Sequence, residues 1–182
     1  RNEYVKHLQA MSELSGYSKE VAQQNAATIM KMETEMAKNS RKLEALRDPI
    51  KNYNKMSITA LSSATPNIDW NSVTTSMGIK NVDSVIVGQP EFYKALNQML
   101  KSYSIKNWKT YLEWQLVDGY ASYLNSDFEK QNFYFFSTIM SGVKEQKPRW
   151  KRIVEQTDGA LGELIGQIYI KEYLPKGSKE KL

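Results

Sequence analysis

Hydrophobic residues recur every three or four positions along most of the chain, a spacing that predicts long amphipathic helices. The helical pattern covers residues 2–15, 18–39, 90–103, 104–123, 128–140 and 149–173. Gly16 follows the first of these segments, where a left-handed residue commonly ends a helix, and Ser18 is placed to cap the next. The pattern therefore predicts a fold made mainly of helices.

Between residues 49 and 88 the regular spacing breaks into short elements. Ser57 can cap a short helix that runs through Leu61, and residues 70–77 predict another, which Gly78 ends. Residues 82–87, VDSVIV, form the one convincing strand candidate. No second good strand is recognisable, so we expect the partner of this strand to lie in sequence outside the chain.

These patterns predict a mainly α fold, a bundle-like multi-helix lobe with at most one or two short strands, over residues 1–182. We divide it into a helical hairpin (1–48), a region of short elements (49–88) and a bundle of long helices (89–182). The chain starts and stops within patterned sequence and opens with no signal peptide. We therefore expect it to be a segment of a longer protein.

The composition narrows the class of protein. Hydrophobic residues make up 41% and charged residues 25%, as in soluble globular domains. No apolar run approaches the roughly 20 residues that cross a membrane. The chain has no cysteine, which excludes disulfides and thiolate metal sites. Its net charge is +5, but the basic residues are scattered, so we favour a solvated basic surface and expect no nucleic-acid partner.

Candidate catalytic and metal-binding residues are few. His7 is the only histidine and has no second ligand at a useful spacing, so we interpret it as a surface or edge residue. The carboxylates of Glu33 and Glu35, or of Glu44 and Asp48, could perform acid–base chemistry, but solvated charge is the favoured interpretation. The sequence contains neither HExxH nor GxSxG. We predict no catalytic and no metal-binding residue in this chain.

A series of short segments nevertheless carries a resemblance to a known family. In chain order they are YVKHL at 4–8, METEMA at 32–37, RDP at 47–49, YNKMS at 53–57, IDW at 68–70, VIV at 85–87 with PEFY at 90–93, LEW at 112–114, RWKR at 149–152 after Gly142, and GELIGQIY at 162–169. Each segment alone is weakly specific, but their common order and spacing extend over essentially the whole chain. Together they resemble the amino-terminal half of the neprilysin and endothelin-converting enzyme family of zinc metallopeptidases.

The resemblance implies two largely helical lobes around a central chamber, with this segment in the smaller lobe that limits peptide access. The family's zinc site, HExxH with a downstream Glu, lies beyond this chain, so zinc is implied for the parent protein only. Animal relatives carry Cys where this chain has Ile153, and the cysteine-free chain therefore resembles bacterial members. The family also implies an exported or cell-surface location.

The residues that carry the family motifs are expected to be architectural, as buried rings and the polar groups that fix them. They are Arg47, Asp48, Tyr53, Asn54, Trp70, Trp114, Arg149 and Trp150. The implied partners are the catalytic lobe of the parent peptidase and oligopeptide substrates. The alternative is a free-standing helical module that binds peptides or acidic partners.

Overall fold

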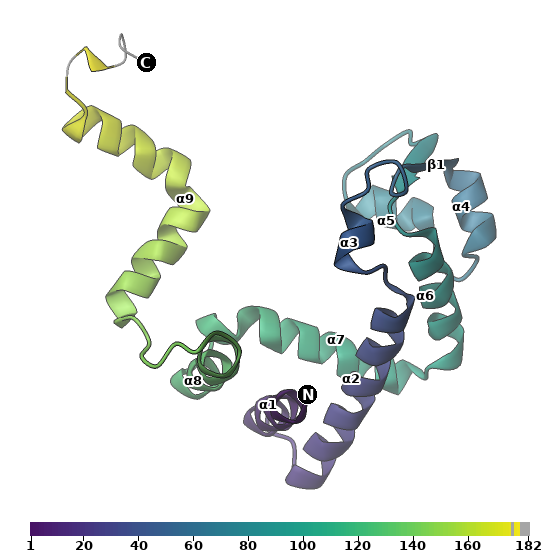
Figure 1. Cartoon of the computed structure of the whole chain (residues 1–182), viewed down its shortest axis with the longest axis horizontal. Coiled ribbons are helices and arrows are strands. Elements are labelled where there is room, and N and C mark those ends of the chain that lie inside the picture. The colour runs from purple at the N-terminus through teal and green to yellow at the C-terminus, as the bar shows by residue number, and fades with distance from the viewer. Residues whose placement is uncertain (176, 179–182) are drawn as a thin grey trace. The chain divides into compact units, whose positions relative to one another are not determined.

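The structure is a computed structural model that describes residues 1–175 and 177–178. The mainly α fold is confirmed (Figure 1). The helices of the described part are α1 (Asn2–Leu14), α2 (Lys19–Asn39), α3 (Leu43–Leu46), α4 (Ile58–Ala64), α5 (Trp70–Ser76), α6 (Pro90–Ser102), α7 (Ile105–Tyr120), α8 (Ser126–Asn132) and α9 (Arg149–Tyr173). A 3-10 turn, η1 (Ala121–Tyr123), follows α7, and a π-helix, η2 (Phe133–Ile139), follows α8. The two strands are β1 (Asn54–Ser57) and β2 (Ser84–Val87).

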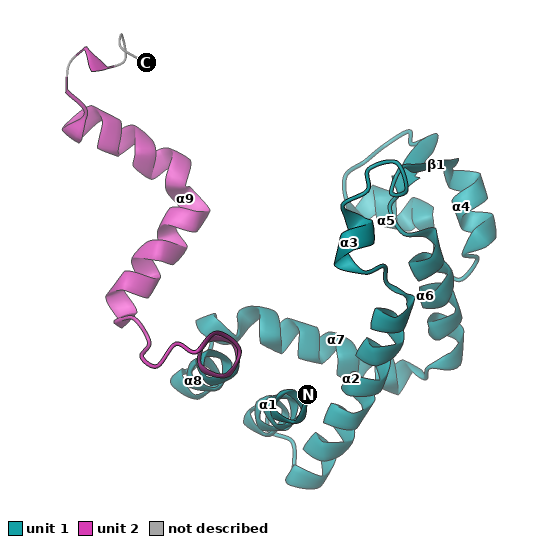
Figure 2. Ribbon diagram, viewed as in Figure 1, with its two compact units in different colours: residues 1–135 teal, residues 136–182 magenta. Residues whose placement is uncertain are grey.

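The chain separates into two compact units, Arg1–Phe135 and Phe136–Leu182 (Figure 2). In the first unit, α1 packs against α2, α7 and α8, and α2 also contacts α6. The core between these helices consists of Leu8, Met11, Ala26, Ile29, Trp114, Ala121 and Phe128. The predicted division into residues 1–48, 49–88 and 89–182 remains a prediction.

Local sequence explains where the first helices begin and end. Gly16 has φ +94°, in the left-handed region that glycine adopts without steric cost, and α1 ends just before it. The hydroxyl of Ser18 accepts a hydrogen bond from the Val21 N–H and caps α2, and Ser104 forms a capping box with Asn107 at the start of α7. These boundaries match the predicted ones.

The strand β2 has a partner within the chain, which corrects the expectation that its partner lies outside. β1 pairs antiparallel with β2, with Asn54 opposite Val87 and Ser57 opposite Ser84. Asparagine and lysine are depleted in strands, and none of the four residues of β1 is β-branched or aromatic. The pairing therefore leaves no periodic signal in the sequence.

The second unit contains α9, which bends at Leu161, where φ is −128° and ψ is 16°. Near its start, Lys147 pairs with Glu155, and the Arg152 guanidinium donates to the Lys147 carbonyl at 2.6 Å. No residue of α9 is buried. Among the described residues, no helix is both long enough and apolar enough to cross a membrane.

Candidate functional site

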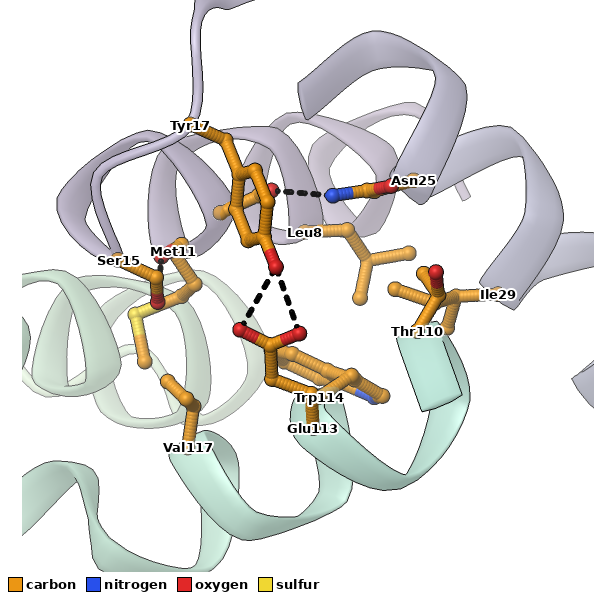
Figure 3. A pocket seen from close by; sticks show the side chains of 11 residues that line it. Leu8, Met11, Ser15, Tyr17, Asn25, Ile29, Thr110, Glu113, Trp114 and Val117 are labelled. Atoms are coloured by element: carbon orange, nitrogen blue, oxygen red, sulfur yellow. Dashed lines mark hydrogen bonds between the residues drawn. The ribbon is translucent and has the colours of Figure 1, made fainter. Parts of the chain in front are cut away.

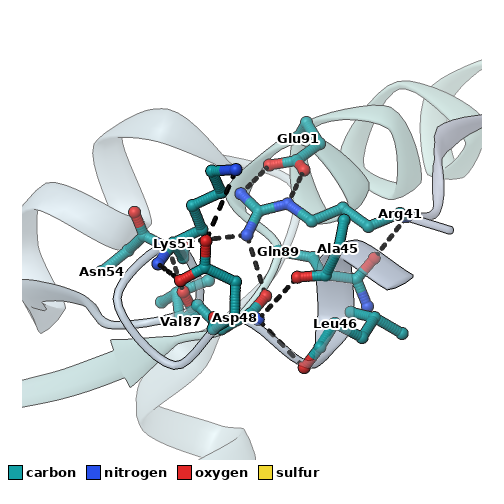
Figure 4. A network of polar contacts seen from close by, with 10 residues as sticks. Arg41, Ala45, Leu46, Asp48, Lys51, Asn54, Val87, Gln89 and Glu91 are labelled. Carbon is teal, nitrogen blue, oxygen red and sulfur yellow. Dashed lines mark hydrogen bonds and ion pairs between the residues drawn. The ribbon is translucent and has the colours of Figure 1, made fainter. Parts of the chain in front are cut away.

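The guanidinium of Arg41 joins three segments of the first unit (Figure 4). It pairs with the carboxylate of Glu91 at the start of α6. Its Nη1 also donates to the Lys51 carbonyl at 2.8 Å and to Asn52 Oδ1 at 2.9 Å. The backbone N–H of Arg41 donates to Gln89 Oε1 at 2.7 Å. Because Arg41 stabilises the carboxylate form, the pKa of Glu91 lies below its usual value. We call this set of contacts the Arg41 clamp.

Two of the predicted motif residues lie beside the clamp and stabilise the turn that leads into β1. The Asp48 carboxylate accepts hydrogen bonds from the N–H groups of Ile50 and Lys51 at 3.0 and 3.1 Å. These bonds, the one from Lys51 above all, lower the pKa of Asp48. Asn54 Nδ2 donates to the carbonyls of Lys51 and Val87, both at 3.0 Å, and so connects the turn to β2 (Figure 4).

Two of the predicted tryptophans are at least partly enclosed. Trp70 is half-buried; its Nε1 donates to Thr65 Oγ1 at 2.8 Å, and its ring meets the Tyr93 ring edge-on with centroids 5.3 Å apart. Trp114 is only 6% exposed and belongs to the main core. Both side chains lie where an architectural role would place them, and that role remains a prediction.

The remaining predicted residues are exposed. Within this chain Tyr53 is 59% and Trp150 64% exposed, so the expected burial of these two rings stays a prediction. Arg47 and Arg149 are exposed as well. Their motif positions are consistent with a role in contacts outside this chain, which stays a prediction.

Glu33 is a half-buried hydrogen-bond acceptor rather than a solvated charge. It is half-buried, and its carboxylate accepts hydrogen bonds from the Tyr4 hydroxyl at 2.8 and 2.9 Å and from Trp114 Nε1 at 3.3 Å. The neighbouring acid, Glu35, accepts from the Tyr103 hydroxyl at 2.5 Å. The prediction of solvated carboxylates is therefore wrong for this pair, because α2 turns both side chains toward aromatic rings of α1 and α7 and of the α6–α7 connection.

His7 is also buried, which corrects its interpretation as a surface residue. It is 1% exposed, and its ring stacks on Phe135 with centroids 4.7 Å apart and meets Trp114 edge-on. Its Nδ1 lies 3.2 Å from Gln131 Nε2, and its Nε2 lies 3.8 Å from Asp118 Oδ1. His7 lies on the same buried side of α1 as Leu8 and Met11. Its two ring nitrogens face Asp118 of α7 and Gln131 of α8.

The hydrogen bond from the Tyr103 hydroxyl to Glu35 predicts that the stability of the protein falls at alkaline pH. Burial, reinforced by Glu35, raises the pKa of Tyr103 to about 12. A group whose pKa is higher in the folded than in the unfolded protein stabilises the folded state fully at pH values below its unfolded-state pKa, which is about 10 for tyrosine. This stabilisation is lost as the pH rises toward the folded-state pKa. We expect the free energy of unfolding to fall between about pH 10 and 12, measured by urea denaturation. Tyr103→Phe should flatten this fall, and an unchanged slope would contradict the assignment.

A small pocket lies between α1, α2 and α7 (Figure 3). Leu8, Met11, Ile29, Trp114 and Val117 provide its apolar lining. The Tyr17 hydroxyl reaches the two carboxylate oxygens of Glu113 at 3.0 and 2.8 Å across it. Its volume is about 20 Å³, enough for about one water molecule. The pocket is therefore too small for a peptide or an organic cofactor.

The Tyr17–Glu113 contact connects the α1–α2 turn to α7, but both residues are exposed. Exposed hydrogen bonds contribute little net stability because water replaces them on unfolding. We expect Tyr17→Phe to lower the free energy of unfolding by at most about 1 kcal/mol in thermal denaturation. A much larger loss would show that this contact, and not core packing, holds the turn against α7.

The described residues do not fit a metal site. Within that part of the chain, no group of three or more histidine, aspartate and glutamate side chains converges as metal ligands would. His7 is enclosed by aromatic rings, and Glu33 is occupied by Tyr4 and Trp114. A zinc ion needs about four ligands at short range, and residues 1–175 and 177–178 offer it no suitable set.

Comparison with known proteins identifies the class. The sequence profile of Peptidase family M13 matches residues 1–182, and the chain belongs to this family. It is 25% identical to an endothelin-converting enzyme homolog of Locusta migratoria, and the match covers 97% of this chain and 26% of that protein. It is 23% identical to neprilysin of Mus musculus, and that match covers 83% of this chain and 22% of neprilysin. The zinc metalloprotease Zmp1 of Mycobacterium tuberculosis, in its open state, has a similar fold, with a TM-score of 0.88 at 23% identity over 98% of this chain and 28% of that one. The chain thus spans about a quarter of the length of these relatives.

The Arg41 clamp is the feature that sequence reasoning missed. Arg41 lies two positions after the end of α2, and its partner Glu91 is fifty positions further along. Neither residue interrupts a hydrophobic pattern, so periodicity gives no signal for the pair. The resemblance to the family did point to the neighbouring turn, through Asp48 and Asn54.

Proposed function

We propose that this chain is the non-catalytic helical part of a zinc metallopeptidase, where it walls the substrate chamber and limits the size of peptides that enter. The parent protein would cleave oligopeptides, with zinc and the catalytic groups supplied by its catalytic lobe. We also propose an exported or cell-surface location, which the family relationship supports.

The observation that carries the proposal is the extent of the family match. Peptidase family M13 matches the whole chain, and the helical fold superimposes on that of a zinc metalloprotease over nearly all of it. The described part has no fitting metal-ligand set, and the sequence has no HExxH. A segment that has the family fold but whose described residues offer no zinc ligands fits the wall of the substrate chamber better than the catalytic centre.

The test uses the full-length protein that contains this segment. Its zinc content is measured by mass spectrometry, and its activity is measured on quenched-fluorescence peptides that share one cleavable core and carry inert extensions of increasing length. We expect bound zinc, and a kcat/KM that falls steeply once the extensions become too bulky for an enclosed chamber.

The control places the same core in an exposed loop of a folded carrier protein. Equal cleavage of carrier and short peptide would refute the size limit while leaving the peptidase assignment intact. A full-length protein with neither zinc nor hydrolysis would refute the peptidase itself. The helical binding module would then be the better description.

A further inference from the structure

Helix α7 is apolar on two opposite faces. One face supplies Trp114 to the core, with Tyr111 and Val117 beside it. The opposite face, which we call the outer face of α7, carries exposed apolar side chains at spacings of seven and four residues, which one side of a helix shares. They are Ile105, Leu112, Leu116 and Tyr120, with Tyr123 of η1 following, and they are between 57% and 76% exposed.

The outer face differs from the outward face of another helix in the same unit. Helix α2 also buries one side, through residues such as Ala26 and Ile29. Its exposed side carries polar residues, among them Gln23, Gln24 and Lys31. That is the usual arrangement for a helix in contact with water. The outer face of α7 therefore departs from the arrangement that α2 shows toward solvent.

Little on the outer face favours water over an apolar partner. Between Ile105 and Leu116, the one charged residue that a helical wheel places on the outer face is Lys109. Gly119 lies on this side too, and a Cβ placed there would meet nothing within 4 Å. A partner could therefore approach the α7 backbone closely at this point. Contiguous exposed apolar residues of this kind mark interaction surfaces.

We propose that the outer face of α7 is a docking surface for an apolar segment of the remaining polypeptide of the parent peptidase. The proposal rests on the proposed function, because it takes its partner from the same longer chain. The matched relatives are about four times as long as this chain, so ample polypeptide exists to cover the face. Burial against such a segment would make α7 a helix packed on both sides.

The test measures thiol accessibility in the full-length protein. This chain contains no cysteine, so one can be introduced as a reporter once any others in the parent are replaced. Leu116→Cys reports on the outer face, and Ile50→Cys, at an 85% exposed apolar position of the same unit, is the matched control. We expect a thiol reagent to label position 116 at least about tenfold more slowly than position 50, with equal rates in denaturant.

Equal labelling at the two positions of the native protein would overturn the proposal. Protection at position 116 that disappears on dilution would also overturn it, because a second copy would then be the partner. If Leu116→Cys does not fold, hydroxyl-radical footprinting of the unmodified protein compares Leu116 and Tyr120 with Ile50, and equal oxidation of these residues would likewise overturn the docking surface.

Zinc content and peptidase activity are measured on the same preparations, so the two proposals fail separately. A protein that protects position 116 but has no zinc or activity keeps the docking surface and loses the proposed function. An active zinc peptidase with position 116 fully accessible keeps the function and loses the docking surface.

Discussion

Replacement of Trp114 by alanine is expected to lower the free energy of unfolding by about 3–5 kcal/mol. The indole is 6% exposed and belongs to the core between α1, α2 and α7. Its ring lies edge-on to those of Tyr4 and His7, with centroids 6.3 and 5.5 Å away. Truncation would leave a cavity among these rings and remove the Nε1 donor from Glu33. Urea denaturation followed by circular dichroism measures the loss.

Trp150→Ala is the matched control, because it removes the same side chain from an exposed position. It should change the free energy of unfolding of this chain by no more than about 0.5 kcal/mol. Trp114→Phe should retain part of the packing and fall between the two. Equal effects of the two alanine substitutions would show that burial of Trp114 does not stabilise the core.

Replacement of Arg41 by methionine is expected to lower the free energy of unfolding by about 2–3 kcal/mol. The Arg41 side chain is 20% exposed, and its guanidinium serves Glu91, the Lys51 carbonyl and Asn52 together. Methionine keeps most of the aliphatic volume but leaves these acceptors without their donor. The partial exposure of Glu91 lets water compensate some of the loss, which keeps the expected value below that for a fully buried pair.

Two further variants separate the clamp from general charge effects. Arg47→Met removes the same charge from an exposed position close by and should cost no more than about 0.5 kcal/mol. Arg41→Lys should recover little, because an ammonium group cannot make the forked contacts of a guanidinium. Full stability in Arg41→Lys would indicate that charge alone, and not the hydrogen-bond geometry, is required.

Helix positions were predictable because they depend on local chemistry. The spacing of apolar residues, the Ser18 and Ser104 caps and the positive φ of Gly16 all act within a few residues of the helix ends that they define. The motifs of the family resemblance are likewise read directly from the chain, and they led to the family that the comparison shows. The absence of an HExxH motif needs no structure either.

Pairings between distant segments were not predictable, because their energy comes from surroundings that only the folded chain creates. β1 has poor strand propensity and is held by β2 and by the turn that Asp48 and Asn54 stabilise. The sequence predicts a surface position for His7, but in the folded chain α7 and α8 enclose its ring.

The sequence alone therefore determined the helices, the family and the lack of a catalytic motif, because each of these is encoded by neighbouring residues. The tertiary structure alone decided which polar side chains are buried and which apolar side chains remain exposed. Arg41 and Leu116 illustrate this division: the charged residue is enclosed by partners from two other segments, and the apolar one faces outward. Burial depends on what packs against a residue, and periodicity shows only that a helix has an apolar side.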